Sequence, residues 1–140
     1  MKVIDGKNVV MGRLASYVAK EILKGEEIRI VNCNEVIITG NRTNIKKNFE
    51  EQRGKFGNSQ KGPKQHKTSE KIVKRTIRGM IPNHREGRGK EALKRVKCYQ
   101  NVPKEFEGTN FFKFETGRKS KFSKVKEFTK WVLKKNIVKK

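Results

Sequence analysis

Charged residues are divided unevenly along this chain of 140 residues, and that division limits where a core can form. Residues 1–41 carry six Lys and Arg against five Asp and Glu, whereas residues 42–100 carry 18 against five, a net charge of +13. Residues 101–140 add +8, which brings the whole chain to +22. So much like charge opposes a compact state unless a partner neutralises it. We therefore expect the first segment to build the fold and the rest to lie against a polyanion, for which nucleic acid is the obvious candidate because neutralised phosphates release condensed counterions.

The first 41 residues contain the pattern of a strand–helix–strand unit. Apolar residues that recur at i, i+4 and i+8 predict a helix over 11–24, and Gly25 follows at the position where a left-handed cap is favoured. A crossover of this length predicts that the strands on either side of the helix are parallel. Short β-branched runs predict three strands in this part of the chain, at 3–5, 28–31 and 36–39.

Beyond residue 41 the predicted elements are shorter and more polar. The segment 53–68 holds many Lys and almost no apolar residue, so we expect it to be extended and mobile without RNA. Five Phe residues between 106 and 122 are expected to fasten the tail to the body of the protein, with contact to a neighbouring protein as the alternative. The remaining predicted elements are helices at 44–52, from residue 68 or 69 to Pro82, at 90–96 and at about 123–135, and a fourth strand at 97–99.

The sequence lacks the residues that several classes of protein need for their function. The chain has no G-x-x-x-x-G-K-[ST] loop and no G-x-G-x-x-G after a predicted strand, so the sequence indicates no nucleotide cofactor. Asp5 is the only Asp, which leaves a paired-carboxylate site hard to assemble. Cys33 and Cys98 are not closely paired as metal ligands usually are, and we expect free thiols, with a disulfide or metal role as the alternative. No run approaches the ~20 apolar residues that a membrane span needs.

The positive charge is densest between Lys71 and Lys97, where a glycine-rich loop joins two short predicted helices. Small residues let backbone N–H groups approach phosphates, and Arg can bind a phosphate bidentately. A solvated surface normally mixes both signs of charge, so the bias of 18 to five over 42–100 favours RNA binding. Arg13 is expected either to reach RNA or to pair with a carboxylate. The complete set of predicted RNA-binding residues is Arg13, Arg42, Lys46, Lys47, Arg53, Lys61, Lys64, Arg75, Arg78, His84, Arg85, Arg88, Lys90, Lys94, Arg95 and Lys97.

Three sequence blocks together resemble the large-subunit ribosomal protein L13 family. The block VIDGKNVVMGRLASYVAKEILKGE (3–26) resembles the opening strand and GRLAS helix of that family. The block VNCNEVIITGN (31–41) resembles its V-N-x-x-x-V-x-I-T-G-N core, and RGMIPNHREGRGKEALKRVKCY (78–99) resembles its signature. The compact N-terminus and the segment 102–106 are more similar to the archaeal and eukaryotic branch than to the bacterial one.

The resemblance implies a fold and a function. The implied fold is a three-layer α/β/α domain with a four-stranded, mainly parallel sheet, here expected over 1–104 and including the basic segment 53–68. A Phe-rich, basic extension with a final helix is expected over 105–140. The implied function is that of a non-catalytic cytoplasmic constituent of the large ribosomal subunit, which binds and organises rRNA during assembly and translation. Expected partners are rRNA and neighbouring ribosomal proteins, without a membrane, a cofactor, a metal or an obligate homo-oligomer.

Two alternatives from other classes remain open. An RNA-modifying enzyme of α/β fold would use the basic face to guide RNA to a cofactor in the crevice of the sheet. It would need a cofactor loop, and turnover on RNA or a co-purifying cofactor would support it. A basic DNA-compacting protein would bind duplex DNA as well as ribosomal RNA at equal salt.

Overall fold

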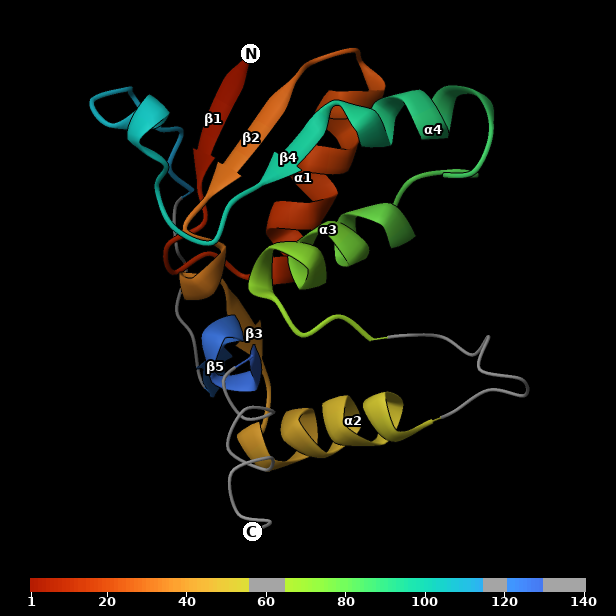
Figure 1. The fold of residues 1–140 in the computed structure, drawn as a ribbon, viewed down its shortest axis with the longest axis vertical. Helices are drawn as coiled ribbons and strands as arrows, with labels where there is room; N and C mark the ends of the chain where they lie inside the picture. Colours follow the sequence, from red (N-terminus) through yellow and green to blue (C-terminus); the bar gives the residue numbers. More distant parts are fainter. Residues whose placement is uncertain (56–64, 115–120, 130–140) are drawn as a thin grey trace, which may run out of the picture.

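The main sheet of the computed structural model, which describes residues 1–55, 65–114 and 121–129, is three-stranded and parallel (Figure 1). The strand order is β1 (Lys2–Asp5), β2 (Ile28–Val31), β4 (Val96–Cys98). Lys2 lies opposite Ile28, and Ile28 lies opposite Val96, with all neighbours parallel. The predicted parallel strand–helix–strand unit is therefore confirmed, and the strand predicted at 97–99 is β4.

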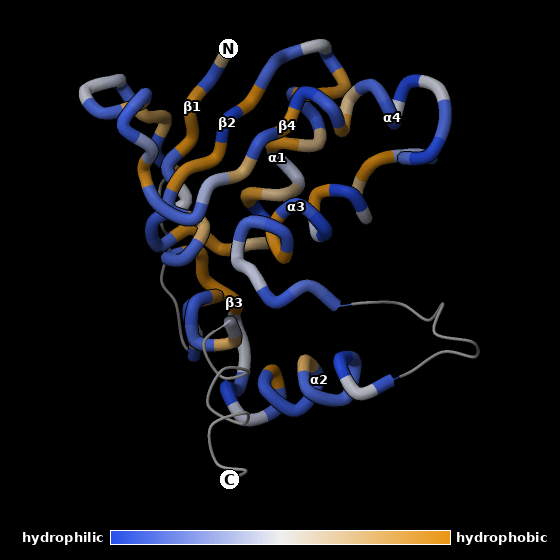
Figure 2. The backbone as a smooth tube through the Cα atoms, in the orientation of Figure 1, coloured by the Kyte–Doolittle hydropathy of each residue, from blue (hydrophilic) through white to orange (hydrophobic). Residues whose placement is uncertain are grey.

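Helix α1 (Met11–Leu23) is the crossover between β1 and β2, as predicted. Leu14, Val18 and Ile22 are completely buried, because their spacing puts them on one face of the helix. The helix ends at Leu23, with Lys24 as its C-cap, and Gly25 follows with a φ of 107°, a left-handed conformation that glycine adopts without a Cβ clash. Figure 2 shows apolar residues concentrated in the strands and recurring along α1 and α3, between polar residues.

Helices α3 (Ser69–Gly79) and α4 (Gly87–Lys94) follow in the more basic half of the chain. Helix α3 packs on α1 through Ile72, Val73 and Ile77, which are all buried. Thr68 is the N-cap residue, but its side chain accepts no capping hydrogen bond; instead the Ser69 hydroxyl donates to Asn34 Oδ1 at 2.7 Å. Helix α4 begins three residues before its predicted start.

The expected four-stranded sheet is not confirmed, because the described main sheet has three strands. Strand β3 (Ile37–Thr39), predicted as a member, instead pairs antiparallel with β5 (Phe122–Lys124). Between β2 and β3 the chain turns through Asn32, which has a φ of 57°, and a short 3-10 helix (Cys33–Glu35). This turn carries β3 away from β2. Strand β3 therefore forms its hydrogen bonds with a segment far along the chain, with Ile37 opposite Lys124.

Strand β5 also corrects the prediction of a helix from residue 123. Residues 122–124 are extended, and the helix begins at Val125 and is described as far as residue 129. Residues 122–124 are extended because they pair with the edge of β3 through backbone hydrogen bonds. The apolar spacing within 123–135 cannot predict such a pairing. The remainder of the predicted helix, 130–135, lies outside the described residues.

Helix α2 (Arg42–Gly54) confirms the predicted helix at 44–52 and is longer at both ends. Asn41 caps it, since its Oδ1 accepts from the Thr43 N–H at 3.1 Å. The helix is largely polar and lies beside the β3–β5 pair, apart from α1 and α3 (Figures 1 and 2). Residues 53 and 54 belong to α2, and residues 56–64 of the segment predicted to be mobile lie outside the described residues.

Part of the Phe-rich segment packs on the domain, as predicted, whereas Phe112 and Phe122 remain 46% and 47% exposed. Phe106 is buried and meets Tyr99 with ring centroids 5.7 Å apart. Phe112 stacks on Tyr17 of α1 at 5.4 Å, and its backbone N–H donates to Val3 O at 2.9 Å. Within the described residues, no helix is long and apolar enough to cross a membrane.

Candidate nucleic-acid interface

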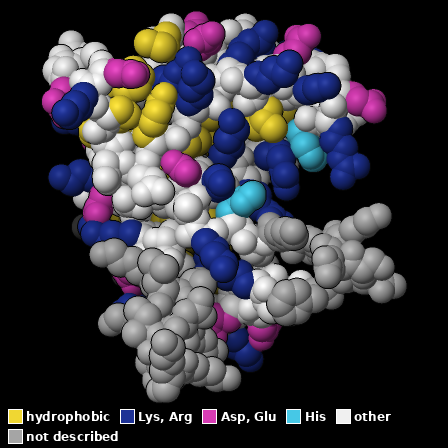
Figure 3. Space-filling model, viewed as in Figure 1, with side chains coloured by type: hydrophobic (Ala, Val, Ile, Leu, Met, Phe, Trp, Pro, Cys, Tyr) yellow, Lys and Arg dark blue, Asp and Glu magenta, His cyan; other side chains and the backbone are white. Residues whose placement is uncertain are grey.

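The Lys and Arg side chains of residues 71–97 form a basic surface, here called the α3–α4 surface. It contains ten Lys and Arg against two Glu. Figure 3 shows these side chains gathered over α3, α4 and their connection, with the two His of the chain among them. Helix α3 and strand β4 are in contact, and both helices pack on α1, so the surface rests on the central core. A surface with this charge bias, held on a packed core, is suited to a polyanion.

The connection between α3 and α4 is held tightly against the first turn of α4. A Cβ atom on Gly89 would lie 1.9 Å from Pro82 O and 2.6 Å from Asn83 O, so only glycine fits there. This close approach fixes the segment that carries His84, which is half-buried, and Arg85, which is exposed. Glycine at position 89 therefore lets the backbone of α4 pack directly against the backbone of residues 82 and 83.

Two predicted RNA-binding residues also have a structural role that the sequence did not indicate. Arg88 donates from Nη2 to Leu23 O at 3.0 Å, and Arg95 donates from Nη1 to Ile22 O at 3.3 Å. Both carbonyls lie in the last turn of α1, where the negative end of the helix dipole favours a cation, and Ile22 O also accepts from the Gly25 N–H at 3.2 Å. A guanidinium has five N–H donors, so these bonds leave others for a phosphate.

Four cationic residues occupy one face of α3, because their spacing is i, i+3, i+4 and i+7. Arg75 and Arg78 belong to the predicted set, whereas Lys71 and Lys74 were missed, although the helical spacing would have identified them. Lys74 is held in place by a hydrogen bond from Nζ to Val96 O at 2.9 Å. The α3 face is thus a row of cations joined to the sheet through Lys74.

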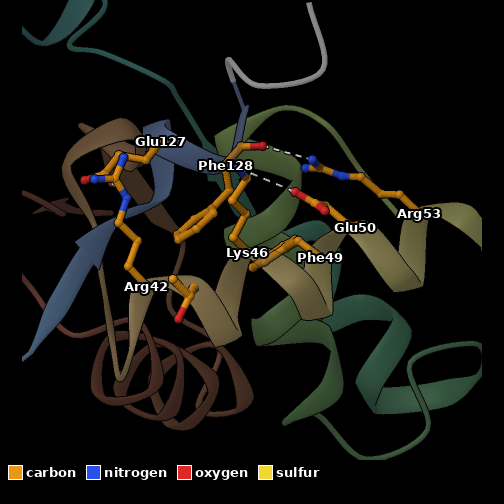
Figure 4. Close-up of a pocket in the computed structure, with 8 residues that line it drawn as sticks. Arg42, Lys46, Phe49, Glu50, Arg53, Glu127 and Phe128 are labelled. Atoms are coloured by element: carbon orange, nitrogen blue, oxygen red, sulfur yellow. Dashed lines mark hydrogen bonds and ion pairs between the residues drawn. The ribbon is translucent and has the colours of Figure 1, made fainter. Parts of the chain in front are cut away.

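The predicted residues on α2 are in a different electrostatic situation, because they are paired with carboxylates. Arg42 Nε lies 3.0 Å from Glu127 Oε2 (Figure 4). Lys46 and Lys47 each lie 3.8 Å from a carboxylate one helical turn later, on Glu50 and Glu51. Only the Lys47–Glu51 pair is fully exposed, whereas Glu50 and Glu127 are half-buried. All three pairs lower the net positive charge that α2 presents to a partner.

Arg53, at the end of α2, makes its described contacts inside the protein. Its guanidinium donates to Phe128 O at 2.9 Å and to His66 O at 3.3 Å, and lies 5.5 Å from the centre of the Phe49 ring (Figure 4). Burial lowers the pKa of Arg53 from its ordinary value. Arg53 therefore ties α2 to the segment before α3 and to the segment after β5.

The other predicted residues are exposed or lie outside the described part. Lys90, Lys94 and Lys97 are exposed on α4 and β4. Arg13 is exposed on α1, and none of the ion pairs found among the described residues involves it. Lys61 and Lys64 lie outside the described residues, so the structure gives them no position.

The two cysteines are free thiols, as expected, with Cys33 buried and Cys98 half-buried. A hydrogen bond with the Cys98 thiol, together with burial, raises the pKa of Cys33 well above its ordinary value, so Cys33 stays protonated at neutral pH. Among residues 1–55, 65–114 and 121–129, no three His, Cys, Asp or Glu side chains are grouped as metal ligands would be.

Comparison with known proteins gives consistent matches. The family described as "Ribosomal protein L13" matches residues 1–105. A Thermoplasma volcanium protein named "Large ribosomal subunit protein uL13" is 50% identical over 104 residues, which cover 74% of this chain and 75% of that protein. Proteins with the same name from Methanocaldococcus jannaschii and Methanococcoides burtonii are 48% and 37% identical, respectively. The Methanocaldococcus jannaschii match covers 74% of this chain and 77% of that protein. The Methanococcoides burtonii match covers 92% of this chain and 91% of that protein.

Proposed function

The chain belongs to the ribosomal protein L13 family, and from that premise we propose that it is a structural, non-catalytic constituent of the large ribosomal subunit. Its task is to bind and organise the rRNA of that subunit during assembly and translation. The observation that carries the RNA-binding proposal is the α3–α4 surface, with ten Lys and Arg against two Glu on a rigid support.

The proposed recognition is of RNA shape and backbone. The major groove of double-stranded RNA is too deep and narrow for side chains to read the bases, so a basic surface contacts mainly phosphates and 2′-hydroxyls. Each phosphate neutralised releases counterions, which favours binding and makes it sensitive to salt. The cations of this surface keep a fixed spacing, which lets them match the spacing of phosphates along an RNA strand. Gly89 fixes the loop, and Arg88 and Arg95 hold α4 to α1. Segments of rRNA that converge on this surface would be held together through their phosphates.

The other predicted residues are proposed as secondary RNA contacts. Arg42, Lys46 and Lys47 are paired with carboxylates, so their contribution is expected to be smaller than that of the α3–α4 surface. Arg13, Lys61 and Lys64 are retained from the charge pattern of the sequence. Arg53 is proposed to act mainly by positioning, since its described hydrogen bonds are to backbone carbonyls of this chain.

Family membership also bears on the partners and on the alternatives. The expected partners are large-subunit rRNA and neighbouring ribosomal proteins, in the cytoplasm, and we propose that the chain is not an obligate homo-oligomer. An RNA-modifying enzyme and a DNA-compacting protein are not supported, because the relatives are named as ribosomal proteins.

Two finer expectations about the fold also remain proposals. The division into a core at 1–104 and an extension at 105–140 is supported by the family match, which covers residues 1–105. The three-layer, four-stranded arrangement is supported by the bridge between Val10 and Ile37, which places β3 next to the end of the β1–α1 connection. Both are tested by a density map of the assembled subunit.

Cosedimentation tests the proposed function. Large subunits from gently lysed cells should carry this protein at physiological salt, and its absence from them would overturn the proposal. A second arm uses the variant Arg85→Glu with Lys90→Glu, which reverses two exposed charges on the α3–α4 surface. The control is Lys104→Glu with Lys113→Glu, two exposed lysines outside that surface. Only the first pair should lower rRNA affinity strongly and flatten its salt dependence.

A further inference from the structure

A small pocket lies within the α3–α4 surface and has an unusual lining. Its volume is about 190 Å³, and it is lined by His66, Lys71, Lys74, Arg75, Arg78 and Leu93, a set here called the α3 pocket. Four cations come from one face of α3, the imidazole comes from the segment before that helix, and Leu93 comes from α4. No Asp or Glu of the described residues lines it.

The lack of a carboxylate distinguishes this pocket from the larger groove between α2 and the segment after β5. That groove, of about 340 Å³, is also lined by three cationic residues, but Glu50 and Glu127 line it as well. Arg42 and Lys46 are paired with these two carboxylates, so the groove is largely self-neutralised (Figure 4). The lining of the α3 pocket, by contrast, brings four like charges together.

The cations of the pocket act on His66 even in the free protein. Burial lowers the pKa of His66 from its ordinary 6.5, and the charges of Arg75, Lys71 and Arg78 lower it further. The lowered pKa favours the neutral form of the imidazole. An anion in the pocket would relieve this repulsion and raise the pKa.

The pocket is also held in position from outside. Lys74 is bound to Val96 O at 2.9 Å, and the His66 carbonyl accepts from Arg53 at 3.3 Å. An ammonium has three donors, so Lys74 keeps two for a ligand. A volume of about 190 Å³ corresponds to roughly six water molecules at ~30 Å³ each, which suits a tetrahedral phosphate with its ester oxygens. Leu93 offers an apolar contact for an adjoining ribose.

We propose that the α3 pocket binds one phosphodiester group of the large-subunit rRNA backbone, at a point where the strand turns into the protein. This inference rests on the proposed function and makes it specific. One phosphate is held by several donors that converge in the pocket, whereas the rest of the α3–α4 surface makes solvent-exposed contacts with single phosphates. Lys71, Lys74 and His66, which are absent from the set predicted from the sequence, become binding residues.

The test compares two double variants of equal charge, using the rRNA fragment that the wild-type chain protects. The pocket variant is Lys71→Gln with Arg78→Gln, and the comparison variant is Lys90→Gln with Lys94→Gln on exposed positions of α4. The pocket variant should lose affinity on the order of 100-fold and the comparison variant less than about tenfold, because convergent charged hydrogen bonds are stronger than open contacts. Equal losses would overturn the pocket inference.

Phosphate ethylation interference then locates the contact. One or two phosphates whose ethylation blocks wild-type binding should cease to matter for the pocket variant, while they still matter for the comparison variant. An identical interference pattern for both variants would overturn the inference. If the wild-type chain binds no rRNA fragment at all, the proposed function itself fails, which is a separate outcome.

Two further measurements distinguish a binding role of these residues from a structural role, and an rRNA phosphate from a free anion. The free pocket variant should melt at the same or a higher temperature than the wild type, and the pKa of His66 should rise, because two repelling charges are gone. A lower melting temperature would instead mark these residues as structural and contradict the inference. Inorganic phosphate and pyrophosphate are the small-anion probes: binding as tight as that of the rRNA fragment would assign the pocket to a free anion and contradict the RNA source.

Discussion

The substitution Gly89→Ala tests whether the rigid packing of the α3–α4 connection supports the basic surface. The added Cβ would lie 1.9 Å from Pro82 O, 2.6 Å from Asn83 O and 3.0 Å from the Asn83 carbonyl carbon. All three are backbone atoms, so no side chain can rotate away to make room. The loop or the first turn of α4 must therefore move.

The expected cost follows from that geometry. Overpacking in a tight site usually costs about 1–3 kcal/mol, and a backbone contact more than an ångström too short puts this site at the upper end, at about 3 kcal/mol. For a domain of this size, that loss lowers the melting temperature by roughly 10 °C. Urea unfolding of the wild type and the variant measures the change directly. Binding to rRNA should weaken as well, because His84 and Arg85 are carried on the displaced loop.

Gly79→Ala is the matched control, since Gly79 is the last residue of α3 and a Cβ there would have no atom within 4 Å. It should leave the free energy of unfolding unchanged or raise it by about 0.5–1 kcal/mol, because alanine loses less backbone entropy. If Gly89→Ala is as stable as this control, the close approach of α4 to the loop is not a real constraint, and the reasoning is refuted.

Three further predictions concern the contacts around the surface. Arg95→Gln should lower the free energy of unfolding by about 1 kcal/mol in a urea titration, because Ile22 O loses a charged donor at the end of α1; an unchanged value would contradict the capping role. Arg53→Lys keeps the charge but cannot reach two carbonyls in the same way, so stability should fall by about 1 kcal/mol; an unchanged midpoint would show that Arg53 does not tie the segments together. Glu35 has a pKa of about 2 because Lys124 and Lys126 bond its carboxylate. These two ion pairs thus stabilise the fold above pH ~4.5, and the effect is lost as the pH falls toward ~2. The melting temperature of the wild type should fall more steeply over that window than that of Glu35→Gln, and parallel curves would contradict this assignment.

Local patterns in the sequence were sufficient for the elements whose partners lie nearby. The helix over 11–24 could be predicted because its apolar spacing is regular and Gly25 ends it, and the parallel pairing of β1 with β2 follows from a single crossover. Strand β3 shows the limit. Its β-branched residues identified a strand, but the pairing with β5 depends on a turn through Asn32 and on a segment far along the chain.

The candidate site shows the same limit. A count of charges located the α3–α4 surface, because net charge does not depend on how the chain folds. It could not separate Arg78, which lines a pocket, from Arg53, which bonds to backbone carbonyls, or from Arg42, which is paired with Glu127. These roles are set by neighbours that are distant in sequence, such as Phe128 for Arg53 and Leu93 for Arg78.

The central claim is that the α3–α4 surface faces rRNA in the large subunit. A density map of large subunits that contain this chain, determined by electron cryomicroscopy, tests it most directly. RNA backbone should run along α3 and α4, with a phosphate at ion-pair distance from Lys71, Arg75 and Arg78. A map in which this surface faces solvent, or is covered by another protein, would contradict the claim.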